Sequence, residues 1–168
     1  TFLKIPLVLI GFDPLMVVFC GALNAVYQFF LHTESVDKMP RWFEAIFNTP
    51  SHHRVHHGKN PQYLDSNYAG TLIIWDKMFG TFAAEDAKDR PNYGLVKDLE
   101  TYNPFRIFAH EYIGIVKDIA TRGLSWKQRV LYILAPPGWS HDGSRLSSED
   151  IKRAAGVLDA PKSMPAGE

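Results

Sequence analysis

The sequence has little that would stabilise a secreted domain or attract a polyanion. It holds one cysteine in 168 residues, and its eighteen basic residues balance eighteen acidic ones. Because the net charge is zero, the chain has no long-range electrostatic field that would attract nucleic acid, and we expect no nucleic-acid partner. Cys20 lies in an apolar run without a partner for an internal disulfide, which predicts a small buried side chain in a reducing, cytosolic-side environment.

The motifs of several common enzyme classes are also missing. There is no H-E-x-x-H zinc-hydrolase pattern, no glycine-rich phosphate loop and no serine or cysteine in a nucleophile elbow. No flavin, haem or nicotinamide motif is present either. If the protein carries out redox chemistry, its electrons must come from a separate donor.

Apolar residues are concentrated at the start of the chain. Between Ile5 and Leu31 only Asp13 carries a charge, and Asp13-Pro14 separates a short apolar run from a longer one. A full membrane span needs about 20 apolar residues, which the longer run approaches. We therefore predict a membrane hairpin fragment over residues 1–31. A buried hairpin in a soluble helical protein is the alternative.

Helix signals continue through the more polar remainder of the chain. A helix is predicted over residues 40–57, with a break at "NTP". Thr49 is expected to cap its second part, Pro50 to occupy the first position and Gly58 to end it in a left-handed conformation. Residues 71–82 form a compact apolar segment that predicts either a helix or a strand.

Three more helices are expected in the C-terminal half. Residues 104–120 place apolar side chains at helical spacing, which predicts a packed amphipathic helix. The stripe consists of Phe105, Phe108, Tyr112, Ile115 and Ile119. Residues 126–134 and 147–158 predict two shorter helices, the second begun by Ser147 and Asp150 in capping-box positions.

Four of the seven histidines lie within "NTPSHHRVHHGKN". His53, His56 and His57 stand at i, i+3 and i+4, which puts their rings on one face of a helix within reach of a common point. Unligated imidazoles in such a group would repel one another when protonated and would need partners when buried. The spacing therefore predicts a metal site, and His52, one turn before His56, is a further candidate ligand. A solvated, histidine-rich helix end is the alternative.

Asn24, Gln28 and His32 recur every four residues through the longer apolar run. They form one polar line, which at membrane depth is expected to face a helix bundle or a cavity. We predict that His32 supplies another metal ligand and that Gln28 orients a ligand or reaches the metal through its amide oxygen. An interfacial histidine at a helix C-terminus is the alternative for His32.

Further polar residues are candidates for supporting the histidines. Asp76 in "WD" and Asn67 in "NY" can accept the second ring proton of a ligand histidine. Each can equally cap the local backbone. Glu34 and Asp65 are candidate carboxylates near the metal, although their spacing does not require that role.

The number of imidazoles does not identify the metal. Three histidines and a water suit catalytic zinc, whereas oxygen-active iron also accepts imidazole and needs open positions. The remaining histidines, His110 and His141, are predicted to lie at the surface and are not counted as ligands.

The segments "YQFFLHTE" and "FNTPSHHRVHHGKNPQYLDSNYAGTLIIWDKMFGTF" resemble the C-terminal half of the fatty acid hydroxylase and sterol desaturase superfamily. The likeness is strongest to its bacterial members and to the animal alkylglycerol monooxygenases. It runs from about Pro6 to Trp139 and is densest from Asn48 to Phe82. The resemblance implies a membrane enzyme whose histidine boxes hold two irons that activate oxygen to hydroxylate or desaturate lipid carbon.

In that pattern His53, His56 and His57 match the last histidine box, and His32 matches a histidine that precedes it. Gln28 stands where some members place another histidine. The two earlier boxes of the family have no counterpart, because no histidine precedes His32. The chain by itself therefore cannot complete a two-iron site. The start without methionine and the short first apolar run lead us to expect the C-terminal portion of a longer protein; a degenerate remnant is the alternative.

The fold expected from these patterns is all-α. We predict an integral-membrane helical bundle fragment with a cytosolic-side helical cap that carries the histidine-rich metal site. Its expected parts are a membrane hairpin fragment over residues 1–31, a histidine-box region over 32–90, and a C-terminal helical cap and tail over 91–168.

The implied function is an oxygen-dependent, di-iron lipid hydroxylase or desaturase, inactive as the isolated fragment. Its partners would be a membrane lipid (fatty acyl, sterol or ether lipid), molecular oxygen and a separate electron donor, and some iron ligands would come from sequence outside this chain. A zinc-dependent membrane hydrolase and a non-catalytic membrane domain with a vestigial histidine box are the alternatives.

Overall fold

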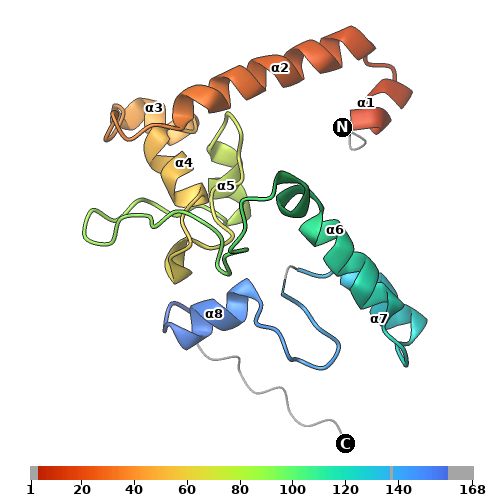
Figure 1. The fold of residues 1–168 in the computed structure, drawn as a ribbon. Helices are drawn as coiled ribbons and strands as arrows, with labels where there is room; N and C mark the ends of the chain where they lie inside the picture. The colour runs from red at the N-terminus through yellow and green to blue at the C-terminus, as the bar shows by residue number, and fades with distance from the viewer. Residues whose placement is uncertain (1–3, 137, 159–168) are drawn as a thin grey trace, which may run out of the picture. The chain divides into compact units, whose positions relative to one another are not determined.

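The structure is a computed structural model that describes residues 4–136 and 138–158 (Figure 1). Its described residues form α-helices, one short 3-10 helix and connecting loops, with two isolated β-bridges and no longer strand. The all-α prediction is therefore confirmed. The chain divides into two compact units, Thr1–Tyr93 and Gly94–Glu168.

The first unit combines one long helix with a group of short ones. The helices are α1 (Ile5–Leu9), α2 (Pro14–Leu31), α3 (Arg41–Ile46), α4 (Pro50–His56), the 3-10 helix η2 (Pro61–Tyr63) and α5 (Ile74–Phe79). In Figure 1 the short helices α3, α4 and α5 gather near the C-terminal end of α2. The predicted break at "NTP" lies between α3 and α4, and the segment that suited a helix or a strand contains α5.

Helix α2 is a candidate membrane span. It is the one helix in the described residues that is long and apolar enough to cross a membrane, with a mean hydropathy of 1.7. Its large apolar side chains point outward, as Leu15 (79% exposed) and Phe29 (73%) illustrate. A helix of a water-soluble protein turns its apolar side inward. The outward surface of α2 is therefore suited to lipid or to other apolar helices.

Cys20 lies on this outward surface and is exposed. The prediction that it is buried is wrong. The apolar run around it turns its side chains away from the unit instead of into a core, so apolar neighbours in the sequence did not mean burial.

The polar line predicted on α2 faces the rest of the unit. Asn24 Oδ1 accepts a hydrogen bond from the Thr71 hydroxyl at 2.8 Å. Gly70 lies against the amides of Asn24 and Gln28: a Cβ there would come 2.7 Å from Asn24 Oδ1 and 2.8 Å from Gln28 Nε2. The contact between α2 and the loop before α5 is thus made by polar groups at close range, and a side chain at position 70 would displace the ends of the two amides.

The histidine helix α4 begins as expected but is capped differently. Thr49 precedes it and Pro50 takes its first position. The Thr49 hydroxyl makes no hydrogen bond to the helix backbone; it bonds to the side chains of Glu44 and Ser51 at 3.3 and 3.0 Å. The start of α4 is therefore held by side chains from α3 and from α4 itself.

The end of α4 corrects the prediction for Gly58. The helix ends at His57 with φ of −88°, and Gly58 is not among the residues with positive φ. Glycine is needed there for space, because a Cβ would lie 3.0 Å from the ring of Tyr63. The backbone at Gly58 also pairs with Tyr93 in an isolated antiparallel bridge.

The second unit holds α6 (Pro104–Ala120), α7 (Trp126–Leu134) and α8 (Ser148–Ala154). These helices lie where the sequence predicts them, and α6 packs on α7. The capping box at the start of α8 is confirmed: Ser147 Oγ accepts from the Asp150 backbone, and Asp150 accepts from the Ser147 backbone at 2.9 Å.

The prediction that the apolar stripe of α6 is packed is wrong for most of its length. Phe105, Phe108 and Tyr112 are 83%, 76% and 65% exposed, and Ile115 is exposed as well. Only Ile119, at the end of the stripe, is half-buried. Helical spacing identified the apolar face, but the short helix α7 does not cover it.

Replacing Gly70 with alanine is expected to weaken the seating of α2. The new methyl group would displace the ends of two amides and disturb the hydrogen bond from Thr71 to Asn24, which is worth about 0.5–1.5 kcal/mol. The thermal unfolding midpoint of the detergent-solubilised chain should fall. Gly114→Ala is the control, because position 114 lies inside α6, where an added methyl group would meet no other side chain or backbone atom within 4 Å. A midpoint of the Gly70→Ala chain equal to that of the unsubstituted chain, with no fall in Gly114→Ala, would contradict the close contact.

Candidate metal centre

The position of α4 is set by the residue that precedes its cap, Asn48, which is fully buried. The Tyr27 hydroxyl of α2 donates to the Asn48 carbonyl at 2.6 Å. The Asn48 side chain donates to the Ala69 carbonyl at 2.6 Å, and its backbone N–H donates to the Thr71 carbonyl at 2.7 Å. These bonds tie the start of the histidine helix both to α2 and to the loop before α5.

His32 reaches the site from the C-terminal end of α2. Its Nδ1 lies 2.8 Å from the backbone carbonyl of Gln28, to which it donates. The neutral ring therefore carries its proton on Nδ1 and presents the lone pair of Nε2. Gln28 contacts His32 through its main chain, whereas its side-chain amide lies against Gly70.

Three imidazole nitrogens meet at one point. The Nε2 atom of His32 lies 3.0 Å from Nε2 of His53 and 3.0 Å from Nε2 of His57, and the last two are 3.2 Å apart. All three contacts cannot be hydrogen bonds, since the proton of the neutral His32 ring is on Nδ1 and only two protons remain. Nitrogens at this spacing can share one metal ion at about 2.1 Å, so the donor set fits a metal.

The two histidines from α4 stay neutral in this environment. Burial, together with the neighbouring His32, His57 and His56, lowers the pKa of His53 to about 3. Burial is also the main cause that lowers the pKa of His57. Since a metal binds only the unprotonated nitrogen, both effects keep the ligands available. The Nδ1 of His53 is buried without a hydrogen-bond partner in the described residues.

His56 lies beside this group and points elsewhere. Its ring centre is 5.5 Å from that of His53 and 5.1 Å from that of His57. Its Nδ1 lies 3.3 Å from the Ser66 carbonyl, and its Nε2, on an exposed side chain, makes no hydrogen bond within the part of the chain that the structure describes. The structure thus brings His53 and His57 together with His32, and turns His56 away from their common point.

His52 lies away from the three nitrogens and forms part of another surface. Its ring is buried, packs edge-to-face on Phe82 at 5.4 Å, and has a lowered pKa caused chiefly by burial. It lines a cavity with residues from α3, α5 and the segment after α5. The structure does not bring it to the group of three histidines.

Asn67 and Asp76 bond to the backbone. Asn67, in a left-handed conformation with φ of 54°, donates to the carbonyls of His52 and Ala83 at 3.0 and 2.8 Å. Asp76 accepts the backbone N–H of Tyr68 at 2.8 Å and that of the next residue at 2.9 Å. Both side chains are buried and hold the loop that packs on α4, and no bond from either to an imidazole ring occurs in the described residues.

The other candidates lie outside the group. Glu34 and Asp65 are exposed, and no carboxylate joins the three histidines within the described residues. His141 is exposed and bonds to the Tyr132 hydroxyl, and His110 is half-buried with its Nδ1 on the Ile107 carbonyl.

Sequence reasoning missed the residue that ties these parts together, Arg54. Its buried guanidinium bonds both carboxylate oxygens of Glu85, with the shortest contact at 2.6 Å. It also donates to the backbone carbonyls of Thr33, Val36 and Asp37. That segment directly follows His32, so Arg54 fastens the His32 side of the site to the helix of His53. The position of Arg54 among four histidines could have suggested a role at the site, but nothing in the sequence indicated that Glu85, 31 residues away, is its partner.

Replacing Arg54 with lysine is expected to cost about 3 kcal/mol of stability and most of the metal content, because one ammonium cannot replace the planar fork. Unfolding in denaturant and metal per chain, measured by mass spectrometry, check both effects. Arg145→Lys is the matched control: Arg145 also forks onto a carboxylate, Asp118, but is half-exposed, so about 1 kcal/mol or less is expected. Full metal content in Arg54→Lys would show that the bonds of Arg54 to the segment after α2 do not position His32.

The site is thus a three-histidine, metal-competent centre on a helical scaffold. The sequence profile of the family described as "Fatty acid hydroxylase" matches residues 1–81, which include all three histidines. The alkylglycerol monooxygenases of Xenopus tropicalis and Homo sapiens are 46% and 44% identical to the chain over 135 residues, 79% of its length. The ornithine lipid hydroxylase OlsE of Rhizobium tropici is 37% identical over 79 residues, 47% of this chain and 24% of that protein.

The chain belongs to the fatty acid hydroxylase and sterol desaturase superfamily, which confirms the resemblance seen in the sequence. It spans 29% of the length of the two alkylglycerol monooxygenases. No solved structure matches it.

Proposed function

We propose that the chain is the C-terminal, metal-binding part of a membrane lipid hydroxylase that uses two irons and molecular oxygen. The observation that carries the proposal is the meeting of three imidazole nitrogens, 3.0–3.2 Å apart, in a member of a lipid hydroxylase family. Hydroxylation is favoured over desaturation because the relatives are named a monooxygenase and a hydroxylase. An ether lipid of the alkylglycerol type is the favoured substrate, since those relatives match the larger share of the chain.

His32, His53 and His57 would hold one iron through their Nε2 atoms. The Nε2 of His56 would serve the second iron, together with ligands from outside this chain. The bound metal would activate oxygen so that hydrogen is removed from an unactivated lipid carbon. The residues of the chain hold the ligand nitrogens unprotonated and aim them: the Gln28 carbonyl orients His32, and burial keeps His53 neutral.

The nitrogens of His32, His53 and His57 lie 3.0–3.2 Å apart, a spacing at which all three could share one metal ion. Iron is favoured over zinc because the relatives are named a monooxygenase and a hydroxylase, and oxygen-active iron accepts imidazole ligands.

The surroundings support a site that receives its substrate from the bilayer. The outward apolar surface of α2 ends at Phe30, two residues before His32, so a lipid beside α2 would reach the level of the metal. We place this end of α2 and the metal on the cytosolic side, where an electron donor can dock. Asn67 and Asp76 would then serve the site indirectly. They hold the loop that carries Ser66, whose carbonyl oxygen accepts the hydrogen bond from Nδ1 of His56.

Single alanine substitutions at His32, His53 and His57 should each abolish turnover and lower the iron content, because each removes one of three ligands. His110→Ala and His141→Ala should leave both unchanged. The measurements are iron per chain and product formation from an alkylglycerol in membranes that contain the enzyme together with its native preceding sequence. Full activity in any of the first three variants would contradict the assignment.

The same preparation separates the alternatives. Oxygen consumption that depends on lipid and on iron supports the hydroxylase. A zinc-loaded protein that consumes no oxygen but hydrolyses an ester identifies the zinc hydrolase, and a protein that binds no metal identifies the vestigial domain.

A further inference from the structure

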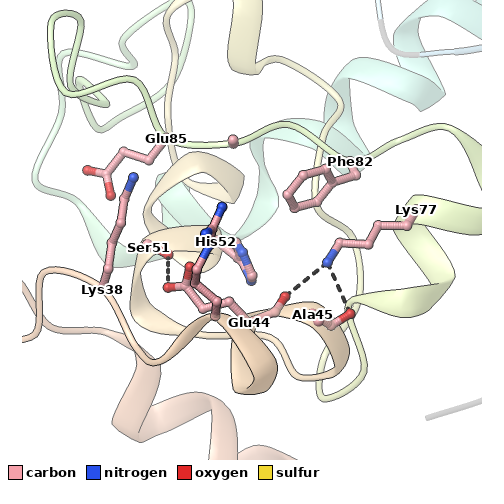
Figure 2. Close-up of a pocket in the computed structure, with 10 residues that line it drawn as sticks. Lys38, Glu44, Ala45, Ser51, His52, Lys77, Phe82 and Glu85 are labelled. Atoms are coloured by element: carbon pink, nitrogen blue, oxygen red, sulfur yellow. Dashed lines mark hydrogen bonds between the residues drawn. The ribbon is translucent and has the colours of Figure 1, made fainter.

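We propose that the cavity behind α4 is a binding site for an oxyanion, a phosphate or carboxylate group. The cavity has a volume of about 250 Å³ and lies within the first unit (Figure 2). The charged and polar side chains of its wall include Lys38, Arg41, Glu44, His52, Lys77 and Glu85. A water molecule occupies about 30 Å³, so the space suits a polar group that carries a substituent.

The two carboxylates of the cavity wall already have partners. Glu85 is bonded through both oxygens to Arg54. One oxygen of Glu44 accepts the Ser51 hydroxyl at 2.9 Å and the Met39 backbone N–H at 3.0 Å. Glu85 is therefore matched by Arg54, whereas Glu44 keeps its negative charge and offsets one of the cations that line the cavity.

Two of the three cations that line the cavity have no partner among the described residues. Lys38 and Arg41 make no hydrogen bond or ion pair there, whereas Lys77 donates to the carbonyls of Glu44 and Ala45 at 3.0 Å. With Glu85 matched by Arg54, the three lining cations are set against the single carboxylate of Glu44, an excess of two positive charges. Arg41 also stands at the first position of α3, where the helix dipole disfavours a cation. The excess would be relieved by an anion.

The floor of the cavity supplies a buried polar group without a partner. His52 is 4% exposed, and its Nδ1 is buried without a hydrogen-bond partner within the described residues. In Figure 2 its ring lies between Lys38 on one side and Phe82 and Lys77 on the other. A neutral imidazole has one donor and one acceptor, and leaving them unmade in a protein interior is unfavourable. An oxyanion in the cavity can accept a hydrogen bond from the imidazole N–H.

The location points to two sources for the oxyanion, a lipid headgroup or a soluble small molecule. The short helices that form the cavity wall gather near the C-terminal end of α2, where polar headgroups would lie if α2 spans a bilayer (Figure 1). The cavity is also separate from the three histidine nitrogens, because it contains none of those side chains. The inference therefore does not depend on which metal the histidines bind.

The test uses the whole chain in phosphatidylcholine nanodiscs and follows phosphorus-31 line broadening. One arm adds inorganic phosphate to the solution, and the other adds phosphatidic acid to the disc. Saturable broadening of the soluble phosphate supports a soluble ligand, and saturable broadening of the phosphatidic acid signal alone supports a headgroup. The absence of saturable binding in both arms would overturn the proposal.

The double variant Lys38→Gln/Arg41→Gln removes two exposed positive charges. It is expected to bind whichever probe the unsubstituted chain binds, inorganic phosphate or phosphatidic acid, about tenfold more weakly. Neither side chain bonds to the described rest of the unit, so the fold should persist. Lys97→Gln/Lys127→Gln removes the same charge in the second unit and should bind as the parent does. Equal loss in both double variants would assign the binding to net charge and would reject the site.

His52→Phe keeps the ring and removes its polar atoms. It is expected to weaken probe binding while the metal content per chain stays unchanged. A fall in metal content with unchanged probe binding would make His52 a metal ligand and would remove it from the cavity site.

Discussion

The structure of the first unit depends on one buried cation, Arg54. Taking a guanidinium out of water is costly, and the cost is offset only when its donors are used. Arg54 meets this condition by bonding Glu85 and three backbone carbonyls of the segment after His32. Both the segment that follows α2 and the segment that follows α5 must therefore close on α4. One side of α4 then faces His32, and Glu85 becomes part of the cavity wall on another side.

Polar contacts also replace a large apolar core elsewhere in this unit. Few large side chains are fully buried, and some of the largest ones, such as Asn48 and Asn67, are amides. The apolar area that would form a core in a water-soluble helical domain lies on the outside of α2. This inversion would suit a bilayer, in which lipid covers apolar surface while backbone and amide groups need partners inside the protein. The polar line of α2 and the glycine opposite it follow from the same requirement.

The predictions from sequence that proved wrong share one cause. Periodicity and spacing report which side chains lie on the same face of a helix, but not what that face meets. The stripe of α6 was identified correctly, yet it stays exposed, and Cys20 lies on the outside of an apolar helix. Gly58 was assigned to the helix end because glycine often serves there, whereas the ring of Tyr63, brought close by the fold, is what requires it.

The sequence by itself determined most of the helices, the family and the candidate ligands, because local spacing, proline and capping residues act within a few positions along the chain. The i, i+4 relation was enough to pair His53 with His57, and the four-residue line was enough to turn His32 toward them. Only the tertiary structure decided that His56 turns to the Ser66 carbonyl and that His52 faces a cavity, since those choices depend on loops far away in sequence. The same holds for Arg54, whose partners lie up to 31 residues away and become neighbours only when the chain closes around a charge that cannot be left without them.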